Sequence, residues 1–135
     1  MLNELLNASY TSEKNALSLY ENLASFGDVF NEIANIRKNA IILIEKFAST
    51  HDYELACENE AIFLPAKNKE DALIQALNYE LELNKMYEKF CESLDDEELK
   101  DLFFRLWATS NNEYVASLKQ RLKEIYSGCE IKNEL

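Results

Sequence analysis

Apolar residues recur at helical spacing along four stretches of the chain, and each stretch predicts one amphipathic helix. The predicted helices cover residues 3–26, 29–49, 69–94 and 96–126. Pairs of residues that suit helix caps precede the last two helices, namely Asn68 with Asp71 and Asp95 with Glu98. The apolar stripe of the second helix consists of Val29, Ile33, Ile36, Ala40, Leu43 and Phe47. The stripe of the last helix shifts around residues 109–112, so the sequence does not fix which way this helix faces.

The connections between these helices predict how they are arranged. A two-residue link, with Gly27 ending the first helix and Asp28 capping the second, makes these two helices antiparallel neighbours. Helical periodicity lapses between residues 50 and 67. Roughly 17 residues of extended chain span up to about 55 Å, which is enough to run the full length of a bundle. Four helices with one long crossover between the second and the third form the ferritin-like, all-α arrangement.

Composition fits a single helical domain over residues 1–128, followed by a loose tail at residues 129–135. Two glycines and one proline leave few turns for an all-β fold, and 47% of the residues are hydrophobic. The sequence contains no run of about 18 apolar residues, which predicts no membrane-spanning segment. Three cysteines without CxxC spacing fit a reducing compartment, and the start of the chain does not resemble a signal peptide. We therefore expect a cytoplasmic protein.

The formal net charge of −11 bears on which partners the chain binds. It argues against nucleic acid and against anionic membrane surfaces. It is compatible with the binding of cations, but a solvated acidic surface explains it equally well. A homo-oligomer formed through bundle faces is also compatible with the sequence.

Two carboxylates fall on faces that the pattern predicts to be apolar. Glu80 interrupts the stripe of the third helix, which comprises Leu73, Ala76, Leu77, Leu83, Tyr87, Phe90, Cys91 and Leu94. A buried ionised side chain without a partner costs several kcal/mol, so Glu80 is either a metal ligand or a core carboxylate that is protonated or hydrogen-bonded. The tyrosines that could donate to it are Tyr20, Tyr87 and Tyr114. Glu13 shares a face with the first helix's apolar residues, or it is a surface residue that pairs with Lys14 or solvent.

Inward carboxylates matter in this architecture because such bundles often hold two metal ions. One Glu from each of two helices and a Glu-x-x-His from each of the other two supply the ligands, which suit iron or manganese. The motif Glu13-Lys14-x-Ala16-x-x-x-Tyr20 resembles the start of a rubrerythrin-related family of unknown function within the ferritin-like superfamily. Later segments of that family resemble Phe30-x-x-Ile33-Ala34, the helix around Glu80, and Ser110-x-Asn112. The resemblance covers roughly residues 5–50 and 70–122.

The chain departs from that family at several ligand positions. The family's second helix carries Glu-x-x-His, whereas Ile36 and Asn39 stand here, and Glu113 stands where a His follows Ser-x-Asn. The resemblance leaves Glu13, Glu80 and Glu113 as candidate ligands for one ion, with Asn39 or waters completing its shell. Glu113 as a solvated residue and Glu32 as a substitute ligand are alternatives. The single histidine, His51, lies in the crossover, where we expect it to be exposed.

These observations favour a ferritin-like bundle whose di-metal site is lost or reduced, acting as a binding or structural protein with no cofactor. The alternative is a rubrerythrin-like oxidoreductase or iron-handling protein that binds iron or manganese through the remaining carboxylates. A third hypothesis is a small-molecule pocket lined by aromatic residues. The sequence does not decide whether the protein is an enzyme.

Overall fold

The computed structural model describes residues 2–57 and 60–134, with side chains described as far as residue 127. Its chain forms two compact units, Met1–Pro65 and Ala66–Leu135. Every regular element among the described residues is helical. Within those residues, no helix combines the length and the apolar character that crossing a membrane requires. The single domain over residues 1–128 stays a prediction.

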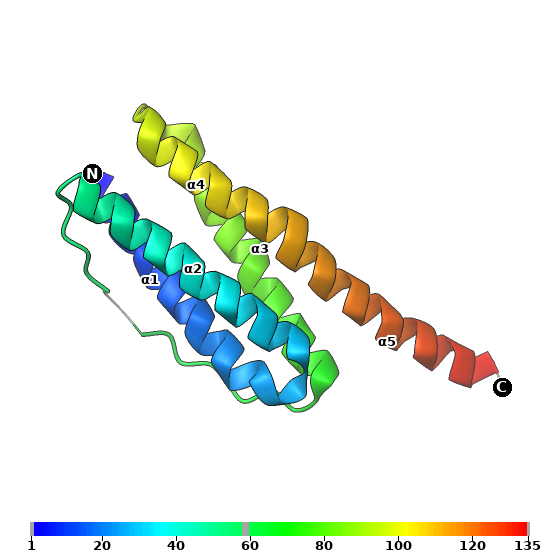
Figure 1. Cartoon of the computed structure of the whole chain (residues 1–135). Helices are drawn as coiled ribbons and strands as arrows, with labels where there is room; N and C mark the ends of the chain where they lie inside the picture. The colour runs from blue at the N-terminus through cyan, green and yellow to red at the C-terminus, as the bar shows by residue number, and fades with distance from the viewer. Residues whose placement is uncertain (1, 58–59, 135) are drawn as a thin grey trace. The chain divides into compact units, whose positions relative to one another are not determined.

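The first unit is built on an antiparallel pair of helices, α1 (Leu2–Leu23) and α2 (Asp28–Thr50), which Figure 1 shows side by side. A short 3-10 turn, η1 (Ala24–Phe26), and Gly27 join them. Asp28 was expected to cap α2 but is its first residue, and Gly27 takes the cap position. An acidic side chain in the first turn still stabilises the helix, because the amino-terminal end of the helix dipole is positive.

The buried face of α2 differs from the predicted stripe after Ile33. Ile36 and Leu43 are each 37% exposed. The residues that the core takes instead lie one position further along, and the buried set is Val29, Phe30, Ile33, Ala34, Arg37, Ile41, Ile44 and Ala48. Both sets have helical spacing, because apolar residues occupy two faces of α2. The predicted stripe did not include Arg37, which the structure buries.

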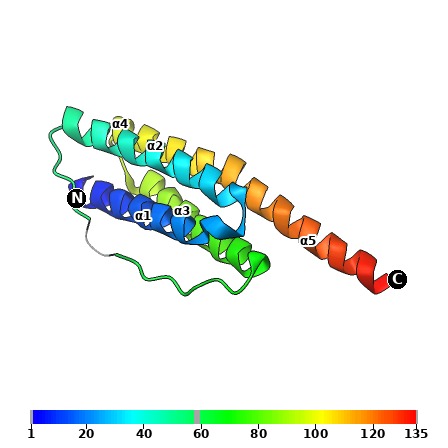
Figure 2. The same ribbon diagram turned by 60° about the horizontal axis from the view of Figure 1, so that its bottom comes forward.

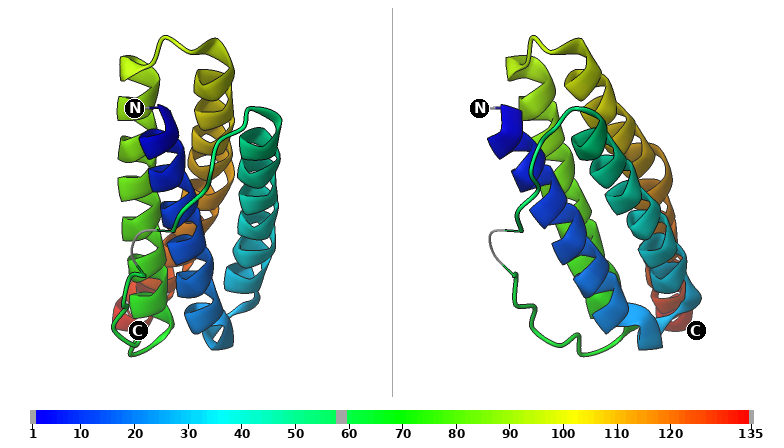
Figure 3. Two further views of the ribbon diagram at one scale, coloured as in Figure 1. Left: turned by 90° about the vertical axis from the view of Figure 1, so that its left-hand side faces the viewer. Right: turned by 60° about the vertical axis from the view of Figure 1, so that its left-hand side comes forward.

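The long connection lies between α2 and the next helix, and its described parts in the first unit, residues 51–57 and 60–65, run alongside α1 (Figures 1 and 3). Its Ala56 N–H donates to Asn7 Oδ1 at 3.0 Å, and its Ala61 N–H donates to Asn15 Oδ1 at 3.0 Å. These two amide side chains lie eight residues apart along α1, and the loop meets them in chain order. The connection therefore travels back along the first unit, as a crossover requires.

The second unit contains α3 (Lys69–Ser93), α4 (Glu97–Thr109) and α5 (Ala116–Glu134). Asn68 caps α3, since its side chain accepts from the N–H of Asp71 at 2.8 Å, as the sequence predicted. The cap of α4 is Asp96, which accepts from the N–H of Leu99 at 2.9 Å, so the prediction of Asp95 was off by one residue. Rings of Tyr87, Phe90 and Phe103 pack where α3 meets α4, with centroids 5.2–6.4 Å apart.

A π-helical segment, η2 (Ser110–Val115), joins α4 to α5, and the three follow one continuous path (Figures 1 and 2). It falls where the apolar stripe of the last predicted helix shifts. A π-turn inserts extra residues into the helix and so rotates the face of everything that follows. The shift in the sequence pattern is therefore the sign of this segment.

The last helix continues to Glu134, whereas we expected a loose tail after Gly128. A single glycine lowers helix stability by only about 1 kcal/mol relative to alanine, so it does not by itself end a helix. Side chains of the tail, including Cys129, lie outside the described residues.

Candidate functional site

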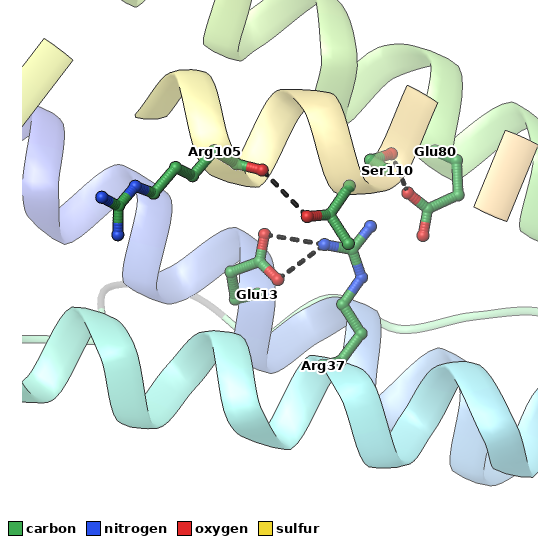
Figure 4. A network of polar contacts seen from close by, with 6 residues as sticks. Glu13, Arg37, Glu80, Arg105 and Ser110 are labelled. Carbon is green, nitrogen blue, oxygen red and sulfur yellow. Dashed lines mark hydrogen bonds and ion pairs between the residues drawn. The ribbon is translucent and has the colours of Figure 1, made fainter. Parts of the chain in front are cut away.

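In the first unit, Glu13 on α1 meets Arg37 on α2 (Figure 4). Nη1 of Arg37 donates to Glu13 Oε1 at 2.8 Å and to Oε2 at 3.0 Å. Glu13 is 0% exposed and Arg37 is 1% exposed, so both charges are out of contact with water. The burial of Glu13 agrees with its predicted inward face. Its partner is Arg37 and not Lys14.

Lys14 instead lies on the surface with its ammonium 4.9 Å from the centre of the Tyr10 ring. A hydrogen bond with Tyr10 is the main cause that raises the pKa of Lys14 above its ordinary value. Lys14 therefore pairs with Tyr10 on the exposed side of α1.

Arg37 changes what the Glu13 carboxylate can do chemically. A guanidinium stays protonated in proteins, so it brings a fixed positive charge to the carboxylate. Arg37 is not among the residues predicted for the site, because the expected ligands were carboxylates and imidazoles. The sequence does contain a sign of its burial. Arg37 stands four residues after Ile33 and four before Ile41, so it is a charged residue at helical spacing between apolar ones, as Glu80 is in its own helix.

In the second unit, Glu80 on α3 accepts a hydrogen bond from Ser110, the first residue of η2 (Figure 4). The Ser110 Oγ lies 2.6 Å from Glu80 Oε2, and both residues are 0% exposed. A hydrogen-bonded core carboxylate was one of the two predicted interpretations of Glu80. The donor found here is a serine, whereas the prediction considered only tyrosines.

The backbone next to Ser110 shows a related contact. The hydroxyl of Thr109 bonds to the carbonyl of Arg105 one turn earlier, at 3.0 Å (Figure 4). Ser and Thr bonds of this kind are a known cause of local helix distortion. Two consecutive hydroxyl residues thus lie at the junction of α4 and the π-helical segment. Thr109 donates to a carbonyl of its own helix, whereas Ser110 donates to Glu80.

The other candidate ligands lie on the surface. Glu113 is exposed on η2, and Glu32 and Asn39 are exposed on α2. His51 is half-buried, because its ring stacks on Phe47 with centroids 4.1 Å apart, whereas we expected it to be exposed. Across residues 2–57 and 60–134, no three His, Cys, Asp or Glu side chains gather in a group that could hold a metal ion.

These donors fit a di-metal site poorly. Glu13 is neutralised by a fixed cation, and the positions of the second-helix ligands hold Ile36 and Asn39, whose side chains are exposed. Carboxylate-rich di-metal sites need acidic or imidazole ligands from all four helices. Metal binding by Glu13, Glu80 and Glu113 stays a prediction.

The cysteines differ in environment, and this difference is testable. Cys57 is exposed, whereas Cys91 is half-buried, with its Sγ 3.9 Å from the carbonyl of Lys100. Burial raises the pKa of the Cys91 thiol above its ordinary value. Because the thiolate is the reactive form, we expect iodoacetamide to modify Cys57 at least about tenfold faster than Cys91 near neutral pH.

Mass spectrometry of the digested protein assigns each modified cysteine to its peptide. In urea the two rates should converge, which serves as the control. Equal rates in the folded protein would contradict the burial of Cys91.

Comparison with known proteins bears on the fold. No protein-family model matches the sequence, and no curated protein matches it. Solved structures do match. One is a Rhodobacter capsulatus bacterioferritin, described with a metal-free dinuclear site and a heme iron. It is 18% identical in sequence with a TM-score of 0.79, and the match covers 90% of this chain and 83% of the bacterioferritin chain. Another is a ferritin-like, diiron-carboxylate protein from Bacillus anthracis. It is 21% identical in sequence with a TM-score of 0.76, and the match covers 90% of this chain and 94% of the Bacillus anthracis chain.

The chain is thus an all-α four-helix bundle of the ferritin-like fold, with its long loop at residues 51–68 between the second and third helices. The predicted fold class is confirmed. At these identities the similarity establishes the fold alone, so the narrower resemblance to a rubrerythrin-related family stays a prediction.

Proposed function

We propose that this protein is a ferritin-like bundle that has given up di-metal chemistry and acts as a non-enzymatic binding or structural protein. The observation that carries the proposal is the contact of Arg37 with Glu13, in which one nitrogen, Nη1, donates to both carboxylate oxygens at 2.8 and 3.0 Å between fully buried groups. In a di-metal protein the positive charge opposite such a carboxylate comes from the ions. Here a side chain of the protein supplies it. The odd number of cysteines fits a reducing compartment, so the proposal includes a cytoplasmic location.

The energetics of the pair favour the proposal. A metal ion that took Glu13 as a ligand would leave the Arg37 guanidinium buried without its carboxylate. Breaking a buried ion pair in this way costs about 3–5 kcal/mol. That cost corresponds to a loss of metal affinity of about a hundredfold to several thousandfold. Repulsion between the ion and the guanidinium would lower the affinity further.

The alternative remains an oxidoreductase or iron-handling protein that binds iron or manganese. Its support is that Glu13 and Glu80 are both fully buried, as inward ligands of this architecture are. The Bacillus anthracis protein with the same fold is described as a diiron-carboxylate protein.

Elemental analysis separates the two functions. Untagged protein is incubated with ferrous iron without oxygen, or with manganese, then desalted and analysed by mass spectrometry. We expect the wild-type protein to retain no more of either metal than the Glu13→Gln and Glu80→Gln variants do, since neither carboxylate is available as a ligand.

The matched control is Glu82→Gln, an exposed position on α3 that should leave any metal content unchanged. One or two equivalents in the wild type and in Glu82→Gln, lost in Glu13→Gln or Glu80→Gln, would overturn the proposal in favour of the alternative.

A further inference from the structure

A small open cavity lies in the second unit, where the end of α3 meets the start of α4. It has a volume of about 230 Å³ and is lined by Cys91, Glu97, Lys100, Asp101 and Phe104. Cys91 is half-buried, and the other four side chains are exposed. Pockets for drug-sized ligands run from about 300 to 1,000 Å³, so a cavity of this size suits a single side chain better than a whole cofactor.

Phe104 gives this cavity an aromatic wall. Its side chain is 55% exposed, whereas the neighbouring Phe103 is fully buried and supplies the aromatic residue that α4 places in the core. The Phe104 ring lies 5.7 Å from the ring of Trp107, measured between centroids. Trp107 is held in turn by a hydrogen bond from its Nε1 to Glu88 Oε1 at 3.0 Å. Phe104 therefore presents an aromatic surface to the cavity that the core does not use.

The charge around the cavity is acidic. Residues 88–105 contain seven acidic and three basic side chains, which leaves a net charge of −4. At the cavity itself the charges balance, because Lys100 lines it and Arg105 pairs with Asp101 at 3.3 Å. The excess comes from the acidic side chains around it, which are Glu88, Glu92, Asp95, Asp96 and Glu98, against Lys89 alone. This part of the surface therefore attracts a cationic partner and repels an anionic one.

We propose that this cavity docks an arginine side chain from a basic segment of another protein. The flat guanidinium stacks on the exposed ring of Phe104, and the carboxylate of Glu97 accepts from its N–H groups. Arginine fits better than lysine, because a guanidinium stacks on aromatic rings and is less strongly hydrated than an ammonium. Lys100 opposes the ligand, since it brings a positive charge to the same cavity.

The size of the contact sets the expected strength. One docked side chain covers little surface, so we expect a dissociation constant on the order of hundreds of micromolar for a short peptide at low ionic strength. The inference goes beyond the proposed function and shares no residue with Glu13, Glu80 or Glu113. Its test and the elemental analysis can therefore fail independently.

Titration of the full-length chain with the capped peptide Lys-Lys-Arg-Lys-Lys tests the proposal, and pentalysine is the matched reference of equal charge. Calorimetry measures both affinities, and we expect the arginine peptide to bind at least about threefold more tightly. The emission of Trp107, the single tryptophan of the chain, should change to saturation because its ring lies beside Phe104. Equal affinities, or binding that leaves the emission unchanged, overturn the proposal.

Three variants of exposed residues test the roles of the lining side chains. Glu97→Gln should weaken binding of the arginine peptide about two- to fivefold, and Lys100→Gln should strengthen it by a similar factor. Phe104→Leu should remove the preference for arginine over lysine, because leucine has no ring on which a guanidinium stacks.

The matched control is Glu82→Gln, which removes an exposed charge from α3 outside the cavity and should change the affinity less than Glu97→Gln does. If the two glutamate variants weaken binding equally, or if Lys100→Gln has no effect, the peptide binds the acidic surface at large and the proposal is wrong. Self-association of the chain that Phe104→Leu abolishes would also overturn it, since a second copy would then be the occupant.

Discussion

Replacing Arg37 by leucine is expected to lower the free energy of unfolding by about 3–5 kcal/mol. The substitution leaves the carboxylate of Glu13 at 0% exposure without the guanidinium that holds both its oxygens. A loss of this size is a large part of the 5–15 kcal/mol that stabilises a typical domain. Urea denaturation followed by circular dichroism at 222 nm measures it, because the fold is helical.

Two further variants separate the pair from its surroundings. Lys38→Leu removes an exposed positive charge from the neighbouring position of α2, and we expect it to change stability by no more than about 0.5 kcal/mol. The double variant Glu13→Leu/Arg37→Leu should recover most of the loss, because two apolar side chains can replace a buried ion pair at little cost. The double-mutant cycle then gives the coupling between the two residues. A loss below about 1 kcal/mol for Arg37→Leu would mean that Glu13 is stabilised by other contacts.

The same pair explains what sequence reasoning missed in the first unit. The helices and the crossover follow from local signals, such as the lapse of periodicity after Thr50 and the cap at Asn68. The face of α2 does not follow from local signals, because apolar residues at two spacings compete. The choice between them depends on a carboxylate 24 residues earlier in the chain. The burial of Arg37 can be predicted only once its partner Glu13 is known.

The second unit shows how a local irregularity can be read correctly and still conceal a contact. The shift of the stripe around residues 109–112 marks the π-helical segment that begins at Ser110. The pattern cannot say what Ser110 meets, because its partner Glu80 stands 30 residues earlier. A carboxylate inside an apolar stripe was a reliable sign of a buried polar contact. The identity of its donor required the tertiary structure.

That contact leads to the second large effect, since Ser110→Ala is expected to lower the free energy of unfolding by about 1–3 kcal/mol. The change takes away a donor that lies 2.6 Å from a fully buried carboxylate oxygen. The measurement is again urea denaturation. The matched control is Ser93→Ala, because that exposed hydroxyl bonds only to a nearby carbonyl of its own helix and should contribute little.

Glu80→Leu tests the same contact from the other side and bears on function. In combination with Ser110→Ala it should be less harmful than Ser110→Ala alone, because an apolar pair replaces a carboxylate that has lost a donor. If Ser110→Ala leaves stability unchanged, the serine does not satisfy Glu80, and the carboxylate is held by groups that could yield to a ligand. That result would favour the metal-binding alternative. A clear loss that Glu80→Leu relieves would instead place Glu80 among the polar groups that the protein has made part of its own core.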